Sequence, residues 1–532
     1  MHKRVTRPHR RAACIAVLLA ICAVFPRGET AAREEAFSAD EIITRDETPP
    51  QDEIATPGEA YPREEATAAL FDEDAAAARP PNIVFIMADD LGYGQLGAYG
   101  QDAIKTPNLD RMAREGIRFT QFYAGSAICA PSRSTLMTGQ HTGRTAIRGN
   151  REILPIGQSQ LPANDLTIAE VLKDAGYATG AFGKWGLGGP DSEGLPTRQG
   201  FDEFFGYLCQ RRAHFYYPEF LYRGDERVPL EGNVVIDDAE RHPGAGPPIR
   251  AEQYSHDLIT DATLRFIETH RDQPFFLYVP STIPHASIEV PAEALSSYLD
   301  EDGRSIFPET AFEGGHYSPQ ERPNAAYAAM ISRLDRDVGR IIAKLEELDL
   351  AENTIVFFTS DNGPAHSGGA NPEFFNSSGP FRGTKRDLYE GGIRVPMLVW
   401  GPGHVPAGRV SGHTWAMWDI LPTAAELAGA AVPLNLDGIS MRDALLGGQA
   451  PSGHDYLYWE VYEQGSAQAV RMGDWKAVRR PMLTGDVELF DLNADIGETT
   501  DLAEENPELV KKMLLIMEEA HTPSDIWQPP QR

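Results

Sequence analysis

The sequence predicts an α/β protein with a large, mostly parallel β-sheet sandwiched by helices and a smaller antiparallel sheet near the C-terminus. Short continuous apolar runs, typical of strands buried on both faces, alternate with longer segments whose apolar residues recur at helical spacing. After about residue 421 this alternation gives way to short strand-like pieces separated by turns. A chain of 532 residues is long enough for one large domain and one smaller one.

The elements follow in chain order from these patterns. An apolar run at 83–87 predicts the first strand, and Thr106-Pro107 is typical of the start of a helix that ends near Gly116. Further helices are expected at 164–175, 254–270 and 324–348, and further strands at 274–279, 354–358 and 396–400. The C-terminal part is expected to contain strands at 456–459, 469–471, 475–478 and 487–490 and a helix at 507–521. We therefore predict a large α/β domain over 80–421 and an α+β subdomain over 422–532.

The N-terminal residues have the pattern of an export signal. A basic stretch at 2–11 precedes an apolar stretch at 12–25 that is short for a bilayer span, and small residues at 30–32 offer a cleavage site. We expect a signal peptide over 1–32 and a periplasmic or secreted protein, with a membrane anchor as the alternative. Residues 33–79 carry acidic clusters without an apolar period, which predicts a disordered acidic linker.

Charge and cysteine content limit the partners and the covalent structure. A formal charge of −30 argues against nucleic acid as a partner, and no stable membrane insertion is expected. Removal of the signal peptide would leave Cys129 and Cys209 of the 4 cysteines. We expect no structural disulfide in the mature protein, and a bridge between these two residues is the alternative.

Two pairs of oxygen-bearing side chains follow predicted strands. Asp89-Asp90 comes just after the strand at 83–87, and Asp361-Asn362 comes just after the strand at 354–358. Ligands of open α/β sheets gather at the carboxyl ends of strands, so these side chains are expected to meet. Carboxylate and amide oxygens suit Ca²⁺ or Mg²⁺, whereas each pair taken alone would equally fit a turn or a helix cap.

Several motifs in order resemble the formylglycine-dependent sulfatases, the arylsulfatase-like branch of the alkaline-phosphatase-like superfamily. The segment 129–139, CAPSRSTLMTG, is similar to the signature of that family, in which a Cys begins C-x-P-S-R. Similar family motifs occur at 82–92, 181–185, 283–285, 358–363 and 384–396. The resemblance therefore extends from about residue 81 to the C-terminal sheet and implies the alkaline-phosphatase-like fold.

The resemblance also implies a reaction, the hydrolysis of sulfate monoesters, with sulfated carbohydrates as the expected substrates. A maturation enzyme would convert Cys129 into formylglycine, whose hydrate attacks sulfur with the help of one divalent metal, for which the resemblance favours Ca²⁺ and Mg²⁺ is the alternative. The metal ligands implied are Asp89, Asp90, residue 129, Asp361 and Asn362. The residues implied to bind sulfate or to transfer protons are Arg133, Lys184, Lys385 and His285, with His285 or Lys385 protonating the leaving oxygen.

One position departs from the family pattern. Many sulfatases continue the Gly-Lys-Trp motif with a histidine that helps to release sulfate, but here that position is Gly186. His141, His214 and His366 are the candidates to replace it.

The segment 207–217 is aromatic and basic, which indicates either a carbohydrate subsite or core packing. The expected substrate-binding residues are Arg211, His214 and His366.

Two other functions remain open from the sequence. The same fold and similar metal ligands could hydrolyse phosphate or phosphonate esters, although the Pro-Ser-Arg context after Cys129 favours sulfate. The chain could also be a non-catalytic sulfoglycan-binding protein whose Cys129 is never converted, an alternative to which Gly186 lends some weight. The complete set of metal ligands and lysines favours the enzyme.

Overall fold

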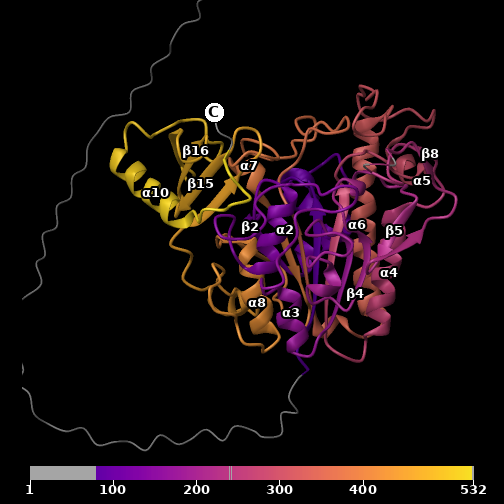
Figure 1. The fold of residues 1–532 in the computed structure, drawn as a ribbon, viewed down its shortest axis with the longest axis horizontal. Coiled ribbons are helices and arrows are strands. Elements are labelled where there is room, and N and C mark those ends of the chain that lie inside the picture. Colours follow the sequence, from indigo (N-terminus) through magenta and orange to yellow (C-terminus); the bar gives the residue numbers. More distant parts are fainter. Residues whose placement is uncertain (1–78, 239, 241, 530–532) are drawn as a thin grey trace, which may run out of the picture. The chain divides into compact units, whose positions relative to one another are not determined.

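The computed structural model describes residues 79–238, 240 and 242–529 (Figure 1). The predicted signal peptide and nearly all of the predicted acidic linker lie outside the described residues. Within the described part of the chain, no helix combines the length and the apolar character that a membrane span requires.

A large mixed sheet forms the centre of the fold. Its strand order is β12-β2-β11-β10-β1-β9-β3-β4-β5-β6, and β13 pairs with β2. The bounds of these strands are β1 (Asn82–Asp89), β2 (Ile117–Tyr123), β3 (Ala178–Lys184), β4 (Glu203–Tyr207), β5 (Phe220–Arg223), β6 (Glu226–Pro229), β9 (Phe275–Pro284), β10 (Thr354–Ser360), β11 (Arg394–Trp400), β12 (Arg409–Ser411) and β13 (Trp415–Ala416).

The middle of this sheet is parallel, as predicted. β1 pairs in parallel with β10 and β9, and β3 continues the parallel part to β4. β11, the predicted strand at 396–400, runs antiparallel to both β10 and β2. The apolar run alone could not give this direction, because a strand buried on both faces has the same composition in either orientation.

Helices cover both faces of the sheet. Alternate residues of β1 point to opposite faces of the sheet, and both faces are buried. Val84 and Ile86 belong to one buried cluster, and Ile83 and Phe85 belong to another. α1, α4 and α6 contribute to the first cluster, and α2, α3 and α8 to the second. The bounds of the helices of this domain are α1 (Pro107–Glu115), α2 (Cys129–Thr138), α3 (Ile168–Asp174), α4 (Ser255–Thr269), α5 (Ala292–Leu295), α6 (Pro323–Glu347), α7 (Glu390–Ile393), α8 (Ile420–Leu427) and α9 (Arg442–Leu445).

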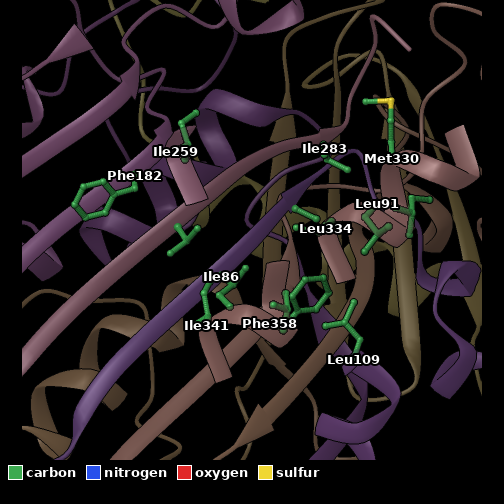
Figure 2. Packing of buried hydrophobic residues seen from close by; sticks show 14 of the residues in the cluster. Ile86, Leu91, Leu109, Phe182, Ile259, Ile283, Met330, Leu334, Ile341 and Phe358 are labelled. Atoms are coloured by element: carbon green, nitrogen blue, oxygen red, sulfur yellow. The ribbon is translucent and has the colours of Figure 1, made fainter. Parts of the chain in front are cut away.

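The long helix α6 closes the first of these clusters. Figure 2 shows Leu334 and Ile341 of α6 beside Ile86 of β1 and Phe358 of β10. These α6 residues are separated by seven positions, which places them on one face of the helix as its apolar spacing predicts. Burial of this face fixes α6 against the sheet.

One helix start and one helix cap differ from the sequence prediction. α3 begins at Ile168, four residues later than predicted, because Thr167 and Glu170 form a capping box. Thr167 Oγ1 accepts the Glu170 N–H at 3.2 Å, and Glu170 Oε2 accepts the Thr167 N–H at 2.8 Å. At α1 the cap comes from Asp335 of α6 rather than from the side chain of Thr106. Such a distant cap leaves no local signal in the sequence.

The C-terminal part forms the predicted small antiparallel sheet. Its strands are β14 (Leu457–Val461), β15 (Ala467–Met472), β16 (Trp475–Arg480) and β17 (Asp486–Asp491), paired in that order. The last helix, α10 (Pro507–Ala520), packs on this sheet through Met513 and Met517. A separate hairpin consists of β7 (Val234–Val235) and β8 (Pro248–Arg250).

A buried ionic contact joins the small sheet to the large domain. Lys476 of β16 lies 2.9 Å from Glu390 Oε1 at the start of α7 and 2.9 Å from Glu498 Oε1. All these side chains are fully buried. The small sheet is thus bound to the large domain by charge as well as by apolar packing.

Candidate active site

Two pairs of polar residues meet at one edge of the large sheet. Asp89 ends β1 and Asp90 follows it, while Asp361 and Asn362 follow β10. Because β1 and β10 are parallel neighbours, both pairs leave the sheet at the same edge. The Asp90 N–H donates to Asp361 Oδ1 at 3.2 Å, and Asn362 Nδ2 donates to Asp90 Oδ1 at 2.8 Å. The structure therefore brings together four of the five residues that the sequence analysis implied as metal ligands.

Cys129 is the first residue of α2 and lies beside these carboxylates. It is only 2% exposed, and its Sγ is 3.6 Å from Asp89 Oδ1 and 3.3 Å from Lys385 Nζ. Ser132 fixes the loop before the helix, because its Oγ accepts two backbone N–H groups of that loop. Burial raises the pKa of the Cys129 thiol to about 12. An unmodified thiol would therefore be protonated at neutral pH.

No disulfide joins the two cysteines of the described chain, in accord with the sequence prediction. Cys129 and Cys209 are both free and buried. Gln158 Nε2 contacts Cys209 Sγ at 3.6 Å. The motif cysteine is thus left available for another modification.

Two buried cations hold the carboxylates in place. Arg133 lies one turn after Cys129 on α2, and its Nη2 donates to Asp361 Oδ2 at 2.8 Å and to Asp89 Oδ2 at 3.1 Å. Lys184 ends β3 and donates to the same Asp89 oxygen at 2.5 Å. Buried charges are tolerated only with such opposite partners, so these cations and carboxylates depend on one another.

Lys385 and His285 both lie against Asp90. Lys385 Nζ donates to Asp90 Oδ1 at 2.6 Å, in addition to its contact with Cys129. His285 follows β9, its Nδ1 donates to the Ala286 carbonyl oxygen at 2.6 Å, and its Nε2 is 3.6 Å from Asp90 Oδ2. Burial, with the charge of Lys385, lowers the pKa of His285 to about 4. The ring is therefore neutral at neutral pH, with its proton on Nδ1.

Burial and neighbouring charges set the protonation of the carboxyl groups. Burial alone would raise the pKa of Asp89 and Asp90, but nearby cations, above all Lys184 and Lys385, hold both pKa values below their usual range. Burial and the charge of Asp89 raise the pKa of Asp361 to about 6. All three carboxyl groups are consequently ionised near neutral pH.

The oxygen atoms of this cluster fit a divalent cation. In the described part of the chain, Asp90 Oδ2 and Asn362 Oδ1 are buried without a hydrogen-bond partner. Buried acceptors without a donor are costly, and a bound cation removes that cost. Ligand atoms of Asp89, Asp90, Cys129 and His285 also lie within 4.8 Å of one another. The oxygen donors match the preference of Ca²⁺ and Mg²⁺.

Gln210 fills the space beside Gly186, the position at which the family motif carries histidine. Gly186 has a φ of +78°, and a Cβ there would lie 2.7 Å from Gln210 Cγ. Gln210 Nε2 donates to Asn150 Oδ1 at 2.8 Å, and the same oxygen accepts the Ala130 N–H at 3.2 Å. A larger residue at 186 would displace Gln210, which is hydrogen-bonded through Asn150 to the residue after Cys129.

Cys129 lines a pocket of about 240 Å³. Lys385, His285, Arg211 and His214, all singled out from the sequence, line it as well. The lining residues that sequence reasoning did not single out are Asn150, Glu152, Gln158, Gln210, His316, Tyr317, Arg386 and Glu463. Gln210 lies within the aromatic and basic segment 207–217 and Arg386 within the motif at 384–396, so both had a signal in the sequence, whereas no motif marks the others.

The segment 207–217 contributes side chains to both the core and the pocket. Tyr207 and Tyr216 are buried in the core, while Arg211 and His214 line the pocket. The His214 ring stacks on His285 with a centroid distance of 4.6 Å and an angle of 17° between the ring planes. Burial lowers the pKa of His214 well below its usual range, so this ring is neutral as well.

His366 and His141 are not among the residues that line the pocket, contrary to the expectation for both. The His366 side chain is 53% exposed and its Nε2 is 3.1 Å from Glu373 Oε1. His141 follows the C-terminal end of α2, whereas Cys129 begins this 10-residue helix. The length of the helix, roughly 15 Å, separates them. Proximity in sequence to a motif did not place either histidine at the site.

Comparisons with known proteins agree on one family. The Sulfatase family model matches residues 81–430, and the model for the C-terminal region of N-sulphoglucosamine sulphohydrolase matches residues 381–521. Arylsulfatase A of Homo sapiens is 36% identical over 423 residues, which cover 76% of this chain and 75% of that protein. N-acetylgalactosamine-6-sulfatase of Canis lupus familiaris is 33% identical over 416 residues, covering 76% and 72%. The crystal structure of Ps i-CgsB, 29% identical, has a TM-score of 0.69 and covers 84% of this chain and 94% of that one.

Proposed function

The chain belongs to the sulfatase family and hydrolyses sulfuric esters, and we propose that sulfated carbohydrates are its substrates and that formylglycine derived from Cys129 is its nucleophile. The observation that carries the proposal is the position of Cys129. It is buried at the start of α2, beside three carboxylates and within 3.3 Å of Lys385 Nζ. Hydrated formylglycine at this position would place a hydroxyl nucleophile among charges suited to a sulfate ester.

One divalent cation completes the proposed site, Ca²⁺ in preference to Mg²⁺. Asp89, Asp90, Asp361 and Asn362 would hold it, and the unpartnered oxygens of Asp90 and Asn362 support this assignment. When bound, the cation supplies Lewis-acid chemistry, which makes a hydroxyl group more nucleophilic and balances anionic oxygens. Residue 129 is the remaining ligand implied by the family resemblance.

One of the protein's own cations would contact the sulfate group, and two others would hold the carboxylates around it. Arg133 and Lys184 orient the carboxylates, and Lys385, 3.3 Å from Cys129 Sγ, is placed to contact a sulfate oxygen. Their charges would stabilise the negative charge that grows as the ester bond breaks. Of the two pocket groups implied for proton delivery to the leaving oxygen, we assign this role to Lys385, because His285 is neutral and donates its ring proton to the Ala286 carbonyl oxygen.

Carbohydrates are the proposed substrate class because of the other pocket walls. Arg211 and the rings of His214 and Tyr317 offer a charge and flat surfaces, which suit sulfated sugars. Ps i-CgsB, the 29% identical protein, has also been crystallised in complex with k-i-k-neocarrahexaose. This resemblance supports a glycan without specifying the sugar.

We further infer that the mature protein is periplasmic or secreted. The basic and apolar pattern of residues 1–32 supports export, and a formylglycine-generating enzyme is the partner that the proposed nucleophile requires. Nucleic acid is not a proposed partner, given the formal charge of −30. The N-terminal sequence of protein recovered outside the cytoplasm of the native host would test the export proposal.

The mass of the tryptic peptide over residues 119–133 tests the proposed nucleophile directly. In protein purified from its native host, the peptide is expected to carry an aldehyde at residue 129. A thiol there, in protein that hydrolyses a sulfate ester, would overturn the formylglycine mechanism. Turnover of the sulfate ester compared with its phosphate analogue measures the preference for sulfate.

Removal of the metal is expected to lower kcat at least about 100-fold, since Lewis-acid assistance contributes several kcal/mol to such reactions. The midpoint of thermal unfolding should also fall, because the cation binds only the folded site. The enzyme would be dialysed against EDTA and then supplied with Ca²⁺ or Mg²⁺. Recovery with Ca²⁺ is expected. Recovery with Mg²⁺ alone would reverse the metal assignment, and unchanged activity after complete metal removal would contradict a catalytic metal.

A further inference from the structure

Rings from separate loops form part of the pocket wall. His214 precedes β5, His285 follows β9, and His316 and Tyr317 precede α6. The centroid distances are 4.6 Å for His214 with His285, 5.4 Å for His214 with Tyr317 and 4.6 Å for His316 with Tyr317. The shape of this wall therefore depends on how the loops are held together.

Glu289 connects the backbone segments that carry these rings. Its Oε2 accepts the N–H of Tyr216 at 2.8 Å, and its Oε1 accepts the hydroxyl of Ser318. Tyr216 lies two residues after His214, and Ser318 directly follows Tyr317. One buried carboxyl group thus bridges two loops that approach the pocket from distant parts of the chain.

Neighbours of Glu289 strengthen the same connection. The Ser287 N–H donates to the His214 carbonyl oxygen at 2.7 Å, and Ser287 Oγ accepts the Ser318 N–H at 3.0 Å. Tyr254 donates its hydroxyl to the Glu289 carbonyl oxygen at 2.9 Å. The segment 287–289 is therefore the common support of both loops, and Glu289 is the ionisable group within it.

The surroundings of Glu289 disfavour its charged form. Its side chain is buried, and the titratable groups that face it are the phenols of Tyr207, Tyr216, Tyr217 and Tyr254. Burial raises the pKa of each phenol, so all four are neutral near pH 7. Burial likewise raises the pKa of Glu289 to about 7, and its hydrogen bonds offset this only in part.

We propose that Glu289 is a positioning residue that holds the His214 and Tyr317 loops together while its carboxyl group is protonated and loosens them when it is ionised. Glu289 does not line the pocket and would act only through these loops. The proposal depends on the proposed function in one respect, because it assumes that this pocket binds the substrate.

Thermodynamic linkage gives the direction of the effect. If the loops separate, Glu289 returns to water and its pKa returns toward the ordinary value of 4.5. The closed arrangement therefore binds the proton more tightly than the open one, so protonation favours closure and a rise in pH favours opening. Between pH 6 and pH 8 the opening equilibrium should increase about tenfold.

Hydrogen exchange of the whole protein tests this coupling without relying on activity. Glu289→Gln keeps an acceptor for the Tyr216 N–H and a polar group for Ser318, but it cannot ionise. After correction for the intrinsic effect of pH, exchange in peptides covering 213–217 and 316–318 should rise about tenfold from pH 6 to pH 8 in the wild type. It should stay constant in Glu289→Gln. The same rise in both proteins would overturn the proposal.

Kinetics with a matched control distinguish the effect of Glu289 from the effect of any other buried carboxyl group. Asp335 is also a buried carboxyl group, whose pKa burial raises to about 6, but it caps α1 and does not line the pocket. KM for a sulfate ester should rise from pH 6 to pH 8 in the wild type and in Asp335→Asn, and stay low in Glu289→Gln. The variants should differ in KM rather than in kcat.

The outcomes distinguish this proposal from the proposed function. If Asp335→Asn removes the pH dependence of KM as Glu289→Gln does, the effect is not specific to the Glu289 connection and the proposal falls. If the wild type, carrying formylglycine and metal, hydrolyses no sulfated carbohydrate, the proposed substrate class fails. Hydrogen exchange would still decide whether Glu289 holds the loops.

Discussion

Replacement of Cys129 by alanine is expected to lower kcat/KM for a sulfate ester at least about 10⁴-fold, the scale of effect seen when a nucleophile is removed. The carboxylates, Lys184 and Lys385 would remain, but no group at residue 129 could be converted into a nucleophile. Steady-state kinetics on the purified variant measure the loss. The thermal unfolding midpoint should change little, because the substitution removes one sulfur atom from a largely polar environment.

Cys209→Ala is the matched control for this prediction. Cys209 is also buried and free, and it contacts Gln158 rather than the carboxylate cluster. It should retain kcat/KM within a few-fold of the wild type. A Cys129→Ala variant that keeps more than about one hundredth of the wild-type activity would show that another group performs the attack.

Replacement of Lys476 by methionine is expected to destabilise the protein by about 3–5 kcal/mol. The change would leave Glu390 and Glu498 buried without their shared cation. Burial would by itself raise the pKa of Glu390, yet the positive charges around it, Lys476 first among them, lower that pKa to about 2. Equilibrium unfolding in urea at neutral pH would give the difference in free energy of unfolding.

Arg480→Ala provides a comparison from the same strand. Arg480 pairs with Asp387 at 3.2 Å, but its side chain is 41% exposed. Removal of this pair should cost less than about 1 kcal/mol, because water screens exposed ion pairs. If Lys476→Met cost no more than Arg480→Ala, the buried contact would not be what binds the small sheet to the large domain.

The central strands and the charged cluster could be predicted because their signals are local. The apolar run at 83–87 and the Asp89-Asp90 pair after it indicate both a buried strand and its functional end. The cap of α1 by Asp335 and the direction of β11 depend on contacts between distant segments, and no local pattern encodes them. Prediction therefore succeeded where one segment carries the whole signal.

The pocket walls show the same limit. His316, Tyr317 and Glu463 reach the pocket from irregular or C-terminal segments whose placement is set by tertiary packing. His366 was expected there because it follows Asn362 closely in sequence, but the chain carries it to an exposed position. The sequence could predict the charged cluster around Cys129 but not most of the other side chains that line the pocket.

The position of β1 at the middle of the sheet has a consequence for how the protein is made. β1 is the first described strand to be synthesised, but its partners β9 and β10 begin at Phe275 and Thr354. Until then its apolar run has neither neighbour, which slows folding and favours aggregation of the nascent chain. Cys129, which is 2% exposed in the folded protein, precedes β9 and β10 in the sequence, so it is synthesised before the sheet can bury it. The proposed conversion of Cys129 would therefore be easiest before β9 and β10 have been synthesised and the sheet has formed.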